Sequence, residues 1–114
     1  MQENYDVAND FQLLDDMAEV QTIFKKVFDG KKCYGTDTLK MGFFHDFILC
    51  AKVEQGKIIF SLPFDGPMTL LLDVVKNTHY NRSDSIVAVC EVSEDNTQLT
   101  ATYYWKEFKL FKDL

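Results

Sequence analysis

Two histidines are the side chains best suited to acid-base chemistry. His45 is followed by Asp46, and His79 lies close to Arg82 and Asp84. A pair of histidines can exchange protons with a substrate as general acid and general base. No catalytic motif accompanies either residue, however, and His45 lies in an apolar stretch that predicts a strand, where a hydrogen-bonded structural role is more common. We therefore expect a protein that is not an enzyme.

Cysteines and glycines add no further chemistry. Cys33, Cys50 and Cys90 form an odd set separated by 17 and 40 positions, which fits neither a disulfide framework nor a zinc site. The five glycines are scattered singly, so no phosphate-binding loop is present. The sequence predicts reduced thiols, no metal and no cofactor.

Acidic residues are concentrated at the start of the chain. The 114 residues carry 18 acidic and 12 basic side chains, for a net charge of -6. Six of the acidic residues and no Lys or Arg fall within the first 24 positions: Glu3, Asp6, Asp10, Asp15, Asp16 and Glu19. One interpretation is that these carboxylates complement a helix dipole. The other is that they form a negative patch that attracts a basic protein.

A long amphipathic helix is the element expected to carry these carboxylates. From about Asn9 to Phe28, apolar residues recur at steps of three and four. Asn9 or Asp10 can cap this helix, and Asp15 and Glu19 then face water. The basic residues of the whole chain are dispersed, which argues against nucleic-acid binding.

The remaining sequence predicts a sheet. Strands are expected at 43–53 and 57–62, joined by a turn at Glu54–Gly56, and at 85–92 and 97–105, joined by a turn at 93–96. Residues 34–37 are expected to form a loop, and residues 77–85 a polar loop. Between them, residues 68–76 are expected to form a short helix, although residues 70–75 could instead form a buried strand. The tail, 106–114, extends the last strand or forms a closing helix.

The expected fold is a single α+β domain spanning 1–114, an antiparallel sheet of four to five strands covered on one face by the long N-terminal helix. Strand alternation places Tyr104 on the face opposite Tyr103 and Trp105, so at least one of these aromatic side chains meets water. Tyr and Trp commonly anchor protein interfaces.

A small acidic domain without catalytic motifs fits a protein that acts by binding another protein. The apolar runs are much shorter than the roughly 18 residues of a membrane span, and the acidic N-terminus is unlike a secretory signal, so we expect a cytoplasmic protein. The profile is typical of a stoichiometric inhibitor, such as an immunity protein or antitoxin that neutralises a basic toxin, for example a nuclease. The expected contact residues are Asp15, Asp16, Glu19, His79, Arg82, Asp84 and Tyr104.

Two alternatives stay open at this stage. In the first, the chain is a small ligand-binding or enzymatic domain with a pocket between helix and sheet, onto which His45, Asp46 and His79 converge. In the second, which is compatible with either function, the chain forms a homodimer through an edge strand or through the face that carries Tyr104.

Overall fold

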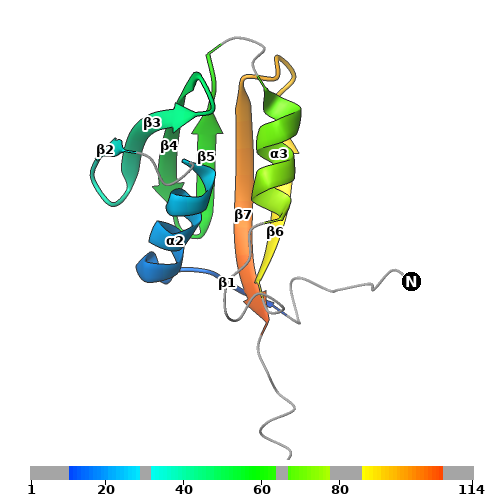
Figure 1. Cartoon of the computed structure of the whole chain (residues 1–114). Helices are drawn as coiled ribbons and strands as arrows, with labels where there is room; N and C mark the ends of the chain where they lie inside the picture. Colours follow the sequence, from blue (N-terminus) through cyan, green and yellow to red (C-terminus); the bar gives the residue numbers. More distant parts are fainter. Residues whose placement is uncertain (1–10, 29–31, 64–66, 78–85, 107–114) are drawn as a thin grey trace, which may run out of the picture.

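Seven strands and two helices make up the part of the chain that the structure, a computed structural model, describes: residues 11–28, 32–63, 67–77 and 86–106. The elements are β1 (Phe11–Leu13), α2 (Met17–Val27), β2 (Cys33–Gly35), β3 (Leu39–Phe44), β4 (Phe47–Glu54), β5 (Lys57–Ser61), α3 (Met68–Lys76), β6 (Ile86–Val92) and β7 (Gln98–Lys106). The fold is α+β as predicted (Figure 1). Its sheet is larger than the four to five strands expected.

All strand pairs in this sheet are antiparallel, in the order β1-β7-β5-β4-β3-β2, with β6 on the second side of β7. The long strand β7 pairs first with β5 and then with β1 along the same side. Tyr103 marks the change of partner, because its backbone N–H donates to the carbonyl of Gly56 and its carbonyl accepts from the N–H of Leu14. This arrangement brings the start of the chain beside its last strand.

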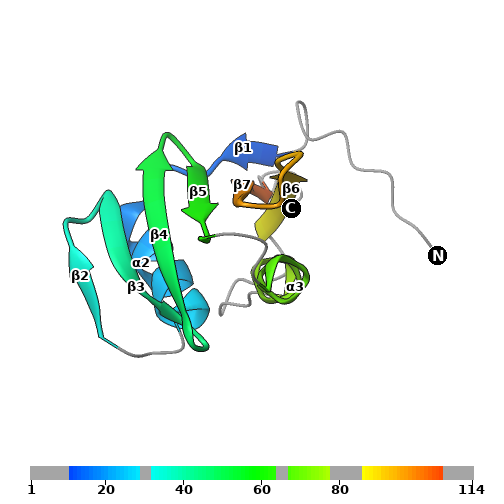
Figure 2. The same cartoon turned by 90° about the horizontal axis from the view of Figure 1, so that it is seen from above.

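Both helices lie on the same face of the sheet (Figure 2). We call the covered side the inner face and the other side the outer face. The core lies between the helices and the inner face. Its members are Val20, Ile23, Phe24 and Val27 of α2, Phe28 after it, Met68, Leu71 and Val75 of α3, and Phe44, Leu49, Ala51, Ile58, Phe60, Leu99, Ala101 and Tyr103 of the sheet, with Leu14 and Leu62 at its margin.

The first described helix is shorter than the 9–28 span predicted from periodicity. Phe11–Leu13 forms strand β1 instead, and α2 begins at Met17. Asp16 is the N-cap, with an extended backbone and a carboxylate that accepts from the N–H of Ala18 at 2.9 Å. The predicted cap residues Asn9 and Asp10 lie outside the described residues. Pairing with β7 satisfies the backbone of β1 in place of a helical turn, which explains the difference.

Two further boundaries were predicted wrongly. The segment 43–53 is not one strand, because His45 and Asp46 form the turn between β3 and β4, with His45 at φ 54°. Residues 34–35 belong to strand β2 rather than to a loop. The apolar residues on both sides of His45 conceal the turn, since an Asn or Gly that would mark it is absent there.

The other elements agree with the sequence. The β4–β5 and β6–β7 hairpins are present, with turns at 55–56 and 93–97. The segment after Pro67 is the helix α3 rather than a strand. The polar loop 78–85 and the tail 107–114 lie outside the described residues, so the predictions for them stay untested.

Candidate functional site

The carboxylates of Asp15, Asp16 and Glu19, which we call the acidic end, gather at the start of α2. Asp15 and Asp16 are exposed and Glu19 is half-buried in the first helical turn. Lys25 and Lys26 occupy the last turn of the same helix. This order of charge complements the helix dipole, and Asp16 also caps the helix. The first interpretation of the acidic residues therefore holds for Asp16 and Glu19, while Asp15 precedes the helix and makes no capping bond in the described structure.

Tyr104 lies close to the acidic end. It is half-buried on the outer face, where its register partners are Leu13 of β1 and Val87 of β6. Leu13 is 41% exposed and precedes Asp15 by two residues. The structure thus brings Tyr104 and the predicted carboxylates to one end of the molecule. The other predicted contact residues, His79, Arg82 and Asp84, lie outside the described residues.

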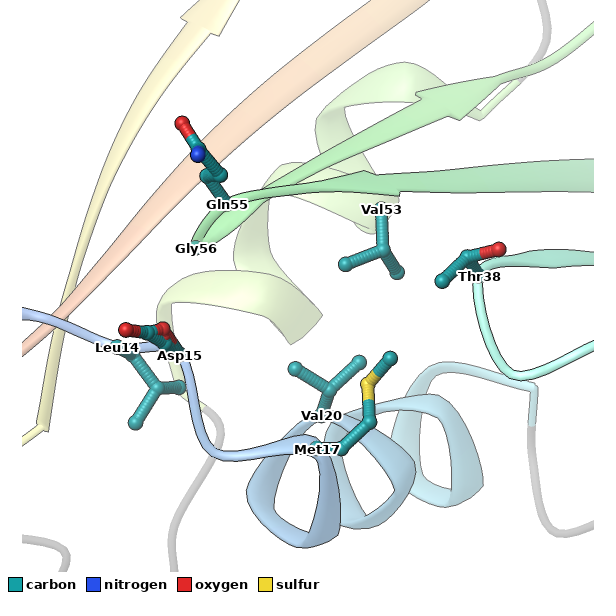
Figure 3. A pocket seen from close by; sticks show the side chains of 8 residues that line it. All are labelled: Leu14, Asp15, Met17, Val20, Thr38, Val53, Gln55 and Gly56. Carbon is teal, nitrogen blue, oxygen red and sulfur yellow. The ribbon is translucent and has the colours of Figure 1, made fainter.

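A small pocket opens between the start of α2 and the turn that joins β4 to β5 (Figure 3). Its volume is about 170 Å³, and it is lined by Leu14, Asp15, Met17, Val20, Thr38, Val53, Gln55 and Gly56. Met17 and Val20 point from the helix towards Val53 on the strand, so the walls are mainly apolar. Asp15 and Gln55 lie at the edge of this lining, and their carboxylate and amide groups extend away from Met17, Val20 and Val53 (Figure 3).

The enzyme alternative predicted a different pocket. A pocket between helix and sheet is present, but His45 and Asp46 do not line it. They lie in the turn at the far end of β3, about 20 Å of extended strand from Thr38. Within residues 11–28, 32–63, 67–77 and 86–106, no three His, Cys, Asp or Glu side chains lie close enough to hold a metal ion. Nothing in that part of the structure places His45 where it could meet a ligand in the pocket.

A second surface was not anticipated from the sequence. On the outer face, five large apolar side chains are each between 50% and 67% exposed: Tyr34, Leu39, Met41, Phe43 and Ile48. We call these five residues the outer patch. They come from β2, β3 and β4, and their alternate neighbours Gly42, Phe44 and Leu49 face the core. The patch is the largest group of exposed apolar side chains on the described strands.

The three cysteines are free thiols and are all half-buried. Burial raises the pKa of the Cys90 thiol, and the positive charge of Lys76 offsets part of that rise. A thiol with a raised pKa is a poor nucleophile at neutral pH. Cys90 therefore behaves as a small apolar residue of β6.

Comparisons with known proteins identify no relative: no protein-family profile matches the chain, and the searches of curated proteins and of solved structures give no significant match. Among the helices that the structure describes, neither is long and apolar enough to cross a membrane. The features that bear on function are therefore the acidic end, the pocket beside it and the outer patch.

Proposed function

We propose that the chain acts by binding a basic protein at the acidic end. One observation carries the proposal: Asp15 lines a mainly apolar pocket at the start of α2, Asp16 and Glu19 follow it in the chain, and Leu13 and Tyr104 are partly exposed nearby. Complementary charge orients an approaching partner and raises its association rate. Partly exposed apolar and aromatic side chains then provide a surface against which the partner packs.

The size and lining of the pocket favour one side chain of a partner over a free metabolite. Pockets for drug-sized ligands usually measure about 300 to 1,000 Å³, and this pocket has about 170 Å³. A Lys or Arg side chain has an apolar stem and a charged head. Met17, Val20 and Val53 would contact the stem, and Asp15, at the edge of the pocket, would offer its carboxylate to the head as the head emerges.

In its more specific form, the proposal is that the protein is a stoichiometric inhibitor, such as an immunity protein or antitoxin that neutralises a basic toxin, for example a nuclease. The net charge of -6 supports this form, because residues 25–114 are balanced and the excess of acidic side chains falls within the first 24 residues. A one-sided negative field accelerates association with a basic protein by about 10-fold or more at low salt.

The test compares two variants that each lose three negative charges. The first carries Asp15→Asn, Asp16→Asn and Glu19→Gln, and the asparagine at position 16 can still cap α2. The matched control carries Asp46→Asn, Asp73→Asn and Glu94→Gln, all exposed and away from the acidic end.

Each tagged protein is used to capture partners from lysate of its host at low and at high salt. We expect the wild type and the control to retain the same basic protein at low salt, and the first variant to lose it. Purified partner then permits measurement of the association rate, which should fall for the first variant alone. Equal capture by all three proteins would contradict the proposed site.

The pocket also favours a second candidate function, in which the chain binds a small ligand directly. Its single carboxylate selects a small cation with an apolar portion. A thermal-shift screen of small amines tests this candidate. Stabilisation of the wild type that is lost in Asp15→Asn, with no basic protein captured, would favour it over protein binding.

A further inference from the structure

The outer patch comes from β2, β3 and β4 and is distinct from the residues of the function proposed above, since Asp16 and Glu19 belong to the start of α2, and Leu13 and Tyr104, although on the outer face, belong to β1 and the end of β7. We propose that this patch is the interface of a homodimer, in which the outer faces of two copies pack against each other. The proposal goes beyond partner binding at the acidic end, since it concerns a different surface and a different occupant.

The five side chains form one continuous surface. Tyr34 pairs with Met41 across β2 and β3, and Phe43 pairs with Ile48 across β3 and β4. Residues directly opposite each other in an antiparallel sheet have side chains about 5 Å apart on the same face. Leu39 continues the row along β3 beyond Met41. The patch therefore presents a ridge of apolar side chains rather than isolated ones.

Polar side chains on the outer face separate the patch from the other apolar side chains there, Leu13, Val87, Val89 and Tyr104 of β1, β6 and the end of β7. Where β7 pairs with β5, its outward positions are Gln98, Thr100 and Thr102, which suit a face in contact with water. On β3 the equivalent positions are Leu39, Met41 and Phe43. On a face exposed to water along its whole width, polar side chains would be expected in place of Leu39, Met41 and Phe43.

The area of the patch is sufficient for a dimer. Large apolar and aromatic side chains present about 200 Å² each, so five that are at least half exposed offer about 500 Å² together. That is near the upper end of the largest patch on an ordinary monomer. Two copies packed face to face would bury about 1,000 Å² from these side chains alone, which reaches the lower bound of a specific interface.

Charge also favours a second copy over a charged partner. Lys52 and Glu54 on the outer face are paired with each other, Nζ to Oε1 at 3.0 Å, and Lys57 lies opposite Glu54 in the register. The margin of the patch is thus nearly neutral, and the patch can meet itself without like-charge repulsion. A basic partner would find no excess of carboxylates there.

The dimer is a symmetric one, in which each copy supplies the same surface. Met41 occupies the middle of the patch, between Tyr34 and Cys50 of the neighbouring strands. Packed sheets lie about 10 Å apart with their side chains interleaved. The helix layers then point away from the interface, so the carboxylates at the start of α2 stay accessible to partners, and Leu13 and Tyr104 lie on β1 and β7, outside the patch.

The experiment measures molar mass by light scattering and sedimentation as the concentration rises from about 1 to about 100 μM, a range that covers a dimer of micromolar affinity. We expect the wild type to approach twice its 13.2 kDa, with little dependence on salt. Met41→Lys and Phe43→Lys should each raise the dissociation constant by about a hundredfold, because they place like charges in an apolar contact.

A matched control is Val89→Lys, since Val89 is 43% exposed on the outer face of β6 and lies outside the patch. This variant should remain dimeric. Met41→Ser, a milder change, should also weaken the dimer, and circular dichroism verifies that each variant keeps its fold.

Two results would overturn the homodimer: a wild type that stays monomeric at the highest concentration, or dimers that both lysine variants leave intact. A monomer that binds a host protein through Met41 would show that the patch serves a different partner. Capture of a basic protein at the acidic end is measured with other variants. Absence of a dimer would therefore not contradict the proposed function, and absence of a captured basic protein would not contradict the dimer.

Discussion

The capping residue Asp16 permits a quantitative test that separates fold stability from binding. Its carboxylate accepts from the N–H of Ala18 at 2.9 Å and adds negative charge at the positive end of the α2 dipole. Removing an N-cap side chain costs about 1 kcal/mol, and removing a favourable charge at the helix start costs about 0.5 kcal/mol. We expect Asp16→Ala to lose both contributions, about 1.5 kcal/mol of unfolding free energy.

Asp16→Asn should lose only the charge, because asparagine caps a helix about as well as aspartate. Its expected loss is therefore about 0.5 kcal/mol. For a domain of this size, 1 kcal/mol corresponds to about 4 °C in Tm, so the alanine variant should melt about 6 °C lower than the wild type and the asparagine variant about 2 °C lower.

Urea unfolding at low and at about 1 M salt distinguishes the two contributions, because salt screens charge and leaves the hydrogen bond largely intact. At high salt the asparagine variant should match the wild type, while the alanine variant should still lose about 1 kcal/mol. Equal losses for the two variants would refute the capping argument. Wild-type stability in both would show that the start of α2 contributes nothing to the folded state.

Three further predictions follow from local geometry. Gly42→Ala should cost about 2 kcal/mol in urea unfolding, because the added Cβ would lie 2.8 Å from a ring carbon of Phe28; a neutral effect would mean that α2 can shift. Burial raises the pKa of the Cys90 thiol, so Cys90 should react slowly with iodoacetamide at pH 8. The raised pKa also favours the protonated thiol in the folded state, so the free energy of unfolding should fall as the pH rises above about 8.5. The hydroxyls of Thr97 and Ser93 lower the pKa of Asp95, so NMR should find it titrating below its ordinary value near 3.8, and the β6–β7 turn should lose stability as the pH falls below about 4.

Elements with local signals could be predicted from the sequence. The β4–β5 and β6–β7 hairpins were anticipated because their turns contain residues that tolerate positive φ, such as Gly56 at 76° and Asn96 at 58°. The helix α3 follows Pro67 and buries Met68, Leu71 and Val75 at helical spacing. In each case the deciding information lies within about ten residues of chain.

Strand β1 could not be predicted, because its partner β7 lies some 90 residues later in the chain. Leu13 fits the helical periodicity of the following residues, so the pattern extends the helix past its true start. Three residues are too few for an alternation signal. Only the tertiary pairing with β7 decides that Phe11–Leu13 is extended. Because the helix was predicted to start too early, the cap was expected at Asn9 or Asp10 rather than at Asp16.

The outer patch was missed for a related reason. In β3, Leu39, Met41 and Phe43 alternate with Lys40, Gly42 and Phe44, so alternation alone favours the first set as the buried face. Sequence alone does not say that α2 and α3 both pack on the inner face. The structure instead buries Gly42 and Phe44 and leaves Leu39, Met41 and Phe43 exposed, and this reversal of the expected faces is the reason for proposing these three residues as an interface.

The two proposed surfaces respond to salt in opposite ways, and this follows from their chemistry. At 0.1 M salt the attraction of the acidic end for a basic partner is largely screened beyond about 10 Å. Burial of the outer patch is apolar and is strengthened by salts such as sulfate. A homodimer would hold two acidic ends on its outer sides, so a partner with two basic sites would bind with added avidity. Met41→Lys should therefore weaken capture of such a partner even though Met41 does not touch it. A partner with a single basic site should bind wild type and Met41→Lys alike, and this difference separates dimerisation from direct contact.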